Sequence, residues 1–270
     1  MNSININGKL HDLSHPLVMQ ILNVSPESFY THCDGLEDAA ERMAAIVAEH
    51  PDILDIGGCS TKPNSTPVSE EEEWQRLEPV LKMMKEKKLD VITSVDTFRS
   101  DIARRCVEEY GVNIINDVTG GAGDPNMFAT VAELQVPYVL TYNSPVADGT
   151  HIVPAALKKL SAGVNQLHDL GVNDIIIDPG FGFNKTHSQE YELMNHLDEL
   201  QILGLPILVG ISHKSMITTA GYYSEQHFSS LHGTIALNLI ALERGANILR
   251  VHEASECRST IALYETLHKK

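Results

Sequence analysis

Residues 175–183 of the chain read Ile-Ile-Ile-Asp-Pro-Gly-Phe-Gly-Phe, an apolar run that ends at a carboxylate and a glycine-containing turn. The β-branched run is the length of one buried strand, and Asp178 stands where that strand would end. Seven further apolar runs end in the same way, in polar side chains or glycines. They lie at residues 18–22, 53–56, 91–95, 113–115, 138–140, 207–211 and 248–249.

Eight short runs separated by helix-length segments predict a (β/α)8 barrel, the fold known as a TIM barrel. In this fold the chemistry collects at the carboxyl ends of the strands, which is where the polar side chains of this chain lie. Between the runs, apolar residues recur every three or four positions, which predicts helices. The expected helices cover about residues 36–49, 69–88, 99–109, 125–134, 154–170, 188–203, 228–244 and 255–268.

The length of 270 residues is the usual size of one such barrel. We therefore expect a single domain over residues 1–270, in which residues 1–16 are an N-terminal extension that forms a hairpin at the bottom of the barrel. Ser69 precedes four glutamates, so it is expected to begin a helix whose acidic first turn faces solvent.

The composition excludes several classes of protein. The formal net charge is −16, which argues against nucleic-acid binding and requires any bound phosphate to be held by local cations or helix N-termini. The N-terminus lacks the pattern of a signal peptide, and no apolar stretch is long enough for a membrane span. Scattered cysteines without a CxxC pair predict a reducing, cytoplasmic location. They are Cys33, Cys59, Cys106 and Cys257.

The turn at residues 178–183 carries the most specific chemical signal. A carboxylate at a strand end can accept two parallel hydrogen bonds from an amidine-like edge, such as that of a guanine or pterin ring. Phe181 and Phe183 could stack on such a planar ring. The alternative is a β-turn with a solvated aspartate and two phenylalanines in the core.

Asp96 and Asn116 are further polar residues at expected strand ends. Together with Asp178 they would offer several donors and acceptors around one barrel mouth, which suits a flat heterocycle better than a sugar or a metal. Each residue alone has an ordinary alternative, because Asp and Asn also cap the helix that follows a strand.

Lys214, Arg250 and His252 are expected at the last two strand ends, where barrels of this type often bind phosphate. Residues 61–62 and Asn23 could reach the same phosphates from the second and first loops. The alternatives are ordinary charged residues at the rim, or a Schiff-base role for Lys214, which would need a desolvated pocket. The histidines show none of the spacings typical of zinc ligands, so the sequence predicts no protein-bound zinc.

Taken together, these motifs resemble those of the dihydropteroate synthase family of pterin-binding barrels, in the same order along the chain. The resemblance runs from about residue 18 to residue 265. The matching motifs lie at residues 21–29, 55–63, 94–97, 115–117, 178–183, 210–215 and 250–252.

The resemblance implies the condensation of 6-hydroxymethyl-7,8-dihydropterin diphosphate with p-aminobenzoate, with Mg²⁺ as cofactor and a homodimer as the assembly. The catalytic residues would be Lys214, Asp96, Arg250 and His252. By the same resemblance the pterin would be held by Asp96, Asn116, Asp178, Phe183 and Lys214, the diphosphate by Asn23, Thr61, Arg250 and His252, p-aminobenzoate by Lys62, Pro63 and Ser215, and the metal by Asn23.

The chain departs from the family pattern in its loops. Cys59 stands where the family has Glu, Lys62 where it has Arg, and His213 where it has Arg before the active-site lysine. Residues 141–143 replace a Met-His-Met, and residues 30–33 depart from the usual first loop. These differences leave open a divergent pterin-binding paralogue with altered or lost second-substrate chemistry. A methyltetrahydrofolate-dependent methyltransferase and a scaffold protein are further alternatives.

Overall fold

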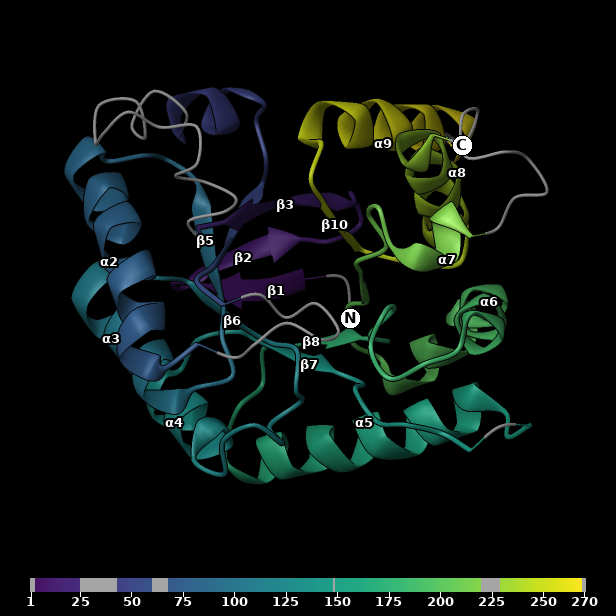
Figure 1. Cartoon of the computed structure of the whole chain (residues 1–270), viewed down its shortest axis with the longest axis horizontal. Helices are drawn as coiled ribbons and strands as arrows, with labels where there is room; N and C mark the ends of the chain where they lie inside the picture. Colours follow the sequence, from purple (N-terminus) through teal and green to yellow (C-terminus); the bar gives the residue numbers. More distant parts are fainter. Residues whose placement is uncertain (1–2, 25–42, 60–67, 148, 220–228, 269–270) are drawn as a thin grey trace.

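The computed structural model describes residues 3–24, 43–59, 68–147, 149–219 and 229–268. Eight parallel strands alternate with helices in a nearly closed barrel, which confirms the predicted (β/α)8 fold (Figure 1). The strand order is β8-β7-β6-β5-β4-β3-β10-β9, and a bridge between Ile177 and Ile207 joins the two ends of the sheet. The strands are β3 (Leu17–Asn23), β4 (Ile53–Gly57), β5 (Ile92–Asp96), β6 (Ile114–Asp117), β7 (Tyr138–Thr141), β8 (Ile175–Asp178), β9 (Leu208–Val209) and β10 (Ile248–Val251).

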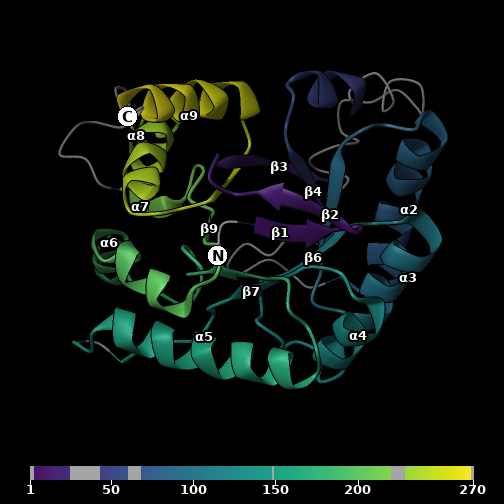
Figure 2. The ribbon, with the colours of Figure 1, turned by 180° about the vertical axis from the view of Figure 1, so that it is seen from behind.

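Helices surround the strands as an outer ring (Figures 1 and 2). A helix at residues 43–48 precedes β4, and the predicted 188–203 helix divides into an α-helix and a 3-10 helix, η2. A short helix, α7, was not predicted. Among the described residues, none of the helices has both the length and the apolar character needed to cross a membrane. Their bounds are α2 (Glu70–Lys87), α3 (Ser100–Tyr110), α4 (Met127–Leu134), α5 (Ile152–Asp169), α6 (His187–Asn195), η2 (Leu197–Leu203), α7 (Ser215–Thr218), α8 (Ser230–Glu243) and α9 (Ala254–His268).

Side-chain alternation along the strands places the polar groups in one layer of the barrel. Successive side chains of a strand point to opposite faces, so a residue and the next but one share the barrel interior. The lower interior layer is a buried apolar cluster that includes Ile53, Ile114 and Ile176. Two residues further along these strands stand Asp55, Asn116 and Asp178. The interior therefore has an apolar lower layer and a polar upper layer, and the polar layer lies at the carboxyl ends of the strands.

The N-terminal residues form an antiparallel hairpin of β1 (Ser3–Ile6) and β2 (Lys9–Asp12). Ile4 and Ile6 are buried in the same cluster as the lower barrel layer, so the hairpin covers the amino ends of the strands. The backbone N–H of Asn5 donates to Asp174 at 2.8 Å, which ties the hairpin to the segment before β8. The hairpin leaves the opposite end of the barrel, where the strands end, to be lined by the loops that follow the strands.

The start of α2 differs in one respect from the sequence expectation. Ser69 caps the helix by accepting a hydrogen bond from the N–H of Glu72 at 3.1 Å, as predicted. The first glutamates of the turn are exposed, but Glu73 is buried and pairs with Arg99, which follows β5. Burial raises the pKa of Glu73, although the hydrogen bond from Thr97 and the charge of Arg99 oppose the rise. One residue of the acidic turn, Glu73, is therefore buried and forms an ion pair beside the end of β5.

Candidate active site

Four polar side chains from four strands of the barrel are buried at its carboxyl end. Asp96, Asn116 and Asp178, which the sequence singled out, stand at the ends of β5, β6 and β8. The fourth is Asp55 on β4, whose side chain is fully buried. Asp55 was not among the predicted site residues because it lies inside an apolar run, two residues before Gly57, the last residue of β4.

Arg250 binds two of these carboxylates from β10. Its Nε donates to Asp55 Oδ2 at 2.7 Å, and its Nη2 donates to Asp96 Oδ2 at 2.7 Å. Asn116 Nδ2 donates to the same Asp55 oxygen at 2.9 Å. Burial disfavours the guanidinium charge, but Asp55 and Asp96 outweigh that effect and raise the pKa of Arg250. Asp55 therefore joins β4, β6 and β10 in one charged network.

Several acceptor atoms in this network are buried and have no hydrogen-bond partner among the residues that the structure describes. They include Asp55 Oδ1, Asp96 Oδ1 and Asn116 Oδ1. Leaving a buried polar group unpaired costs about 1–3 kcal/mol. The site is consequently built to receive N–H or O–H donors from something that enters the barrel mouth.

The turn after β8 is fixed by its own backbone. Gly180 donates its N–H to Asp178 Oδ1 at 2.7 Å and has a φ of +71°, with the carbonyl of Tyr142 where a Cβ would stand. Phe181 is completely buried in the hydrophobic core, so the expectation that it stacks on a ligand is wrong. Phe183 is only half-buried and lies beneath the ammonium of Lys214, 4.7 Å from Nζ to the ring centroid.

Lys214 and Lys185 both approach this turn. The Nζ of Lys214 donates to the carbonyl of Phe181, and its side chain occupies the space beside Gly182. The Nζ of Lys185 donates to the carbonyls of Tyr142, Gly180 and Phe183 at 2.9, 2.6 and 3.0 Å. Burial lowers the pKa of each lysine to about 8, partly opposed by Asp178. The sequence analysis did not identify Lys185, which holds the turn in shape.

Burial also raises the pKa of Asp178, while the charge of Lys214 opposes the rise. The neighbouring strand end at Thr141 is buried as well, and Asn143 is bonded to Asn184 at 2.7 Å. Residues 141–143 differ in type from the family pattern described above. The hydrogen bond between the Asn143 and Asn184 amides joins the loop after β7 to the loop after β8.

The remaining predicted residues lie around the rim. Asn23 ends β3, and Gly57 separates it from Asp96, because a Cβ at position 57 would lie 3.6 Å from Asn23 Oδ1 and 3.5 Å from Asp96 Cβ. His252 is exposed, with its Nδ1 2.8 Å from Ser212 Oγ. Ser215 begins α7, and its Oγ lies 3.1 Å from His187 Nε2. Thr61, Lys62 and Pro63 lie outside the described residues.

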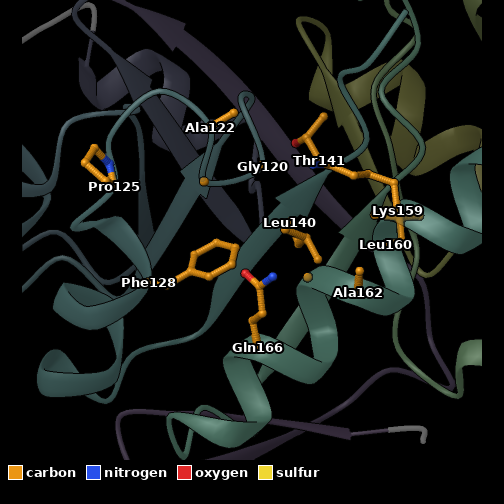
Figure 3. A pocket seen from close by; sticks show the side chains of 12 residues that line it. Gly120, Ala122, Pro125, Phe128, Leu140, Thr141, Lys159, Leu160, Ala162 and Gln166 are labelled. Atoms are coloured by element: carbon orange, nitrogen blue, oxygen red, sulfur yellow. The ribbon is translucent and has the colours of Figure 1, made fainter. Parts of the chain in front are cut away.

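A separate cavity of about 310 Å³ lies outside the barrel wall, between β7, α5 and the segment that leads into α4 (Figure 3). The ring of Phe128 stands on one side and Leu140 with the small residues of α5 on the other. Its lining includes one lysine, Lys159, and none of the aspartates described above. The carboxylate cluster, and not this cavity, is the candidate active site.

The stability of the unliganded protein is expected to depend on pH through Asp96. Burial and the charge of Asp55 raise its pKa from 3.8 to about 7, although Arg250 opposes the rise. Between these two values the native state holds a proton that the unfolded state has lost, so the contribution of Asp96 to the free energy of unfolding falls as pH rises from about 4 to about 7. Urea unfolding across this range should show a smaller fall for Asp96→Asn than for the unmodified protein. Equal slopes for the two proteins would contradict the assignment.

Comparison with known proteins identifies relatives over nearly the whole chain. Residues 19–252 match the sequence profile of a family described as pterin binding enzyme. The dihydropteroate synthase of Clostridium beijerinckii is 36% identical, and the alignment covers 88% of this chain and 89% of that protein. A dihydropteroate synthase of Xanthomonas albilineans solved with 4-aminobenzoic acid superposes with a TM-score of 0.88, at 31% identity over 100% of this chain and 99% of the other. A Thermus thermophilus dihydropteroate synthase in complex with 6HMPPP has a TM-score of 0.83, at 32% identity over 98% and 100% of the two chains.

Proposed function

We propose a catalytic role for the buried carboxylate cluster, starting from the family of the chain. The chain belongs to the pterin-binding enzyme family and is a dihydropteroate synthase. This activity joins 6-hydroxymethyl-7,8-dihydropterin diphosphate to p-aminobenzoate and releases pyrophosphate. The observation that carries the assignment to this cluster is the set of buried acceptor oxygens that lack a partner within the described part of the chain. A pterin ring supplies several N–H donors at one edge, which matches that set.

The pterin would bind flat across the barrel mouth. Asp178 would accept two N–H groups of the amidine-like edge, and Asp96 and Asn116 would accept others. Phe183 would form one wall, with the Lys214 ammonium bonded to a ring acceptor. The Thermus thermophilus relative in complex with 6HMPPP supports a ligand of this kind in the same fold.

The diphosphate would lie toward β3 and β10, near Asn23, Arg250 and His252. Arg250 uses Nε and one Nη for carboxylates, and a guanidinium has five N–H donors, so others remain for a phosphate oxygen. Thr61 from the second loop is proposed as a fourth contact. These local cations are needed because the chain as a whole has a net charge of −16 and repels anions at long range.

Mg²⁺ fits the donors present at β3. This ion usually takes one or two protein oxygens and completes its coordination with water and substrate phosphates. The amide oxygen of Asn23 is proposed as the protein ligand, and the bound ion would neutralise the leaving diphosphate. Family membership supports Mg²⁺ as the cofactor.

The charges of the cluster suit the bond that breaks. As the carbon–oxygen bond to the diphosphate lengthens, positive charge develops on the pterin methylene. Asp55, and Asp96 and Asp178 in their ionised forms, would place buried negative charge around the site that stabilises it, and Arg250 and His252 would face the leaving group. The aromatic amine of p-aminobenzoate would then form the new carbon–nitrogen bond and lose one proton to water, while the diphosphate leaves as pyrophosphate. Ser215, with Lys62 and Pro63 of the second loop, is proposed to hold that substrate.

Pyrophosphate release by the purified protein tests the function. We expect release that depends on p-aminobenzoate, yields 7,8-dihydropteroate, and disappears on chelation of Mg²⁺ and returns when the ion is restored. A reaction that proceeds equally without p-aminobenzoate, or no release while the pterin diphosphate still binds, would contradict the proposed second substrate. Activity that survives chelation would contradict the proposed metal.

A homodimer is proposed through α8 and α9, which pack on each other at the edge of the molecule (Figure 1). Ile240 of α8 is 40% exposed, and Leu263 and Leu267 of α9 are 55% and 65% exposed. The two leucines are four residues apart and so share one helix face. Covering this face by a second copy would remove apolar area from water.

Glutamates at Leu263 and Leu267 together are expected to convert the dimer to a monomer, because the new charges would be buried unpaired at the interface. Light scattering after size exclusion gives the mass. Ile202→Glu is the matched control, since Ile202 is 81% exposed on η2 and should leave the mass unchanged. A monomeric unmodified protein, or a dimer that survives both glutamates, would refute this interface.

A cytoplasmic location is proposed because Cys106 and Cys257 are buried and carry free thiols. Burial raises the pKa of Cys257 to about 12, so this thiol is protonated and unreactive. Fractionation of the source cells would test the location, and recovery in an extracellular fraction would contradict it.

A further inference from the structure

Three potential metal ligands meet beside the active site, at the ends of β9 and β10. They are His213, which follows β9, and His252 and Glu253, which follow β10. One ligand atom from each lies within 4.8 Å of the others. The two histidine rings stand edge to face, with centroids 5.3 Å apart. Local sequence pattern does not predict this group, because residues from separate strand ends become neighbours only when the barrel forms.

Both imidazoles are oriented by a serine hydroxyl. His213 Nδ1 lies 2.7 Å from Ser230 Oγ, and His252 Nδ1 lies 2.8 Å from Ser212 Oγ. Histidines that bind metals usually donate their second ring nitrogen to such a partner, which fixes the ring and the tautomer. In the metal-free protein the Glu253 carboxylate can only accept, so a neutral His213 donates its Nε2–H to Glu253 and accepts at Nδ1 from the Ser230 hydroxyl. Metal binding would move the proton to Nδ1, which then donates to the serine and leaves Nε2 to coordinate.

Glu253 supplies a carboxylate at the centre of the group. Its Oε1 lies 2.7 Å from His213 Nε2, while its Oε2 is buried without a hydrogen-bond partner in the described part of the chain. The side chains of His213 and Glu253 are 32% and 33% exposed, so an ion can enter and both can adjust. An unpaired buried carboxylate oxygen destabilises the metal-free protein, and a bound cation would remove that cost.

The backbone at His213 holds its ring toward this group. His213 has a φ of +55°, in the left-handed region where histidine is commoner than most non-glycine residues. Its N–H donates to Thr234 Oγ1 at 3.1 Å, which fastens the turn to α8. The position of the imidazole is therefore set by the fold and not by a flexible loop tip.

We propose that His213, His252 and Glu253 bind one divalent transition-metal ion of the Zn²⁺ and Co²⁺ class. Imidazole nitrogens select these ions, whereas Mg²⁺ prefers oxygen ligands alone. Two histidines and one carboxylate leave a fourth tetrahedral position for water. The ion takes the place of the hydrogen bond between His213 and Glu253, which opens by a few tenths of an ångström to admit it. This site lies apart from the Mg²⁺ ligand proposed at Asn23 and shares His252 with the proposed diphosphate contacts, so the ion and the diphosphate would meet at His252.

Co²⁺ titration of the metal-free, tag-free protein tests the proposal without substrate, so the result does not depend on synthase activity. We expect one equivalent to bind, with the visible absorption of a low-coordinate nitrogen and oxygen site. His213→Gln and Glu253→Gln should each weaken binding at least tenfold. Ser230→Ala removes only the support of the His213 ring and should weaken it by about 10–100-fold. Circular dichroism checks that each variant is folded.

His196 provides the matched control. It pairs with Glu199 at 3.0 Å on the surface, and among the described residues it belongs to no group of three potential metal ligands. His196→Gln should leave the Co²⁺ affinity and spectrum unchanged. The proposal is overturned if the unmodified protein shows no such absorption, or if the absorption and affinity persist in both His213→Gln and Glu253→Gln.

Discussion

Replacing Arg250 with methionine is expected to lower kcat/KM by about 10²–10³-fold and the free energy of unfolding by about 3–5 kcal/mol. Arg250 is the cation that pairs the buried carboxylates of Asp55 and Asp96, each at 2.7 Å. Methionine fills much of the same volume without charge, so two buried carboxylates would face each other unpaired. Urea unfolding and the rate of pyrophosphate release measure the two effects.

The loss of stability should depend on pH. Protonation relieves a buried carboxylate that has lost its counter-ion, so the deficit of Arg250→Met should be smaller at about pH 5 than at about pH 8. Arg250→Lys should recover only part of the activity, because an ammonium keeps the charge but cannot form the same fork to two carboxylates. The series separates the contribution of charge from that of geometry.

Arg244→Met is the matched control for this series. Arg244 pairs with Asp198 at 3.2 Å, but both side chains are exposed. Such pairs contribute up to about 1 kcal/mol, so the variant should keep nearly the stability and all the activity of the unmodified protein. If Arg250→Met behaved like Arg244→Met, the buried network would have neither the structural nor the catalytic role assigned to it.

The barrel and much of its polar mouth follow from local sequence pattern. Asp96, Asn116 and Asp178 each end an apolar run, and strand ends of a parallel barrel lie on one face. Asp55 follows from a different pattern, the alternation of side chains along a strand. It stands two places after Ile53, so the two side chains share the barrel interior. Applying that alternation to Ile53 would have found Asp55 before the structure did.

Other features could not be predicted from local pattern because they depend on tertiary contacts. Phe181 and Phe183 are equivalent in sequence, yet the first packs in the core and the second faces Lys214. Lys185 lies in the loop after β8, but its Nζ donates to three carbonyls, one of which belongs to Tyr142 just past the end of β7. The His213–Glu253 pair joins two strand ends that are distant in sequence.

Asp178→Asn is expected to weaken binding of the pterin by about 10²-fold while leaving inorganic pyrophosphate affinity unchanged. The carboxylate of Asp178 is proposed to accept two N–H groups of the pterin edge. An asparagine would turn an N–H donor toward one of them, so it loses an acceptor and adds a repulsion. Calorimetry with 7,8-dihydropteroate and, separately, with pyrophosphate and Mg²⁺ measures the two halves of the site.

This selectivity separates a pterin contact from general damage to the barrel. Asp198→Asn changes an exposed aspartate on η2 in the same chemical way and should alter neither affinity. If Asp178→Asn lowered the affinity for both ligands equally, the turn would be disturbed, since Asp178 also accepts the Gly180 N–H at 2.7 Å. Asparagine retains one acceptor oxygen for that bond, so the turn should persist. Unchanged dihydropteroate affinity would mean that the pterin edge lies against another residue of the mouth.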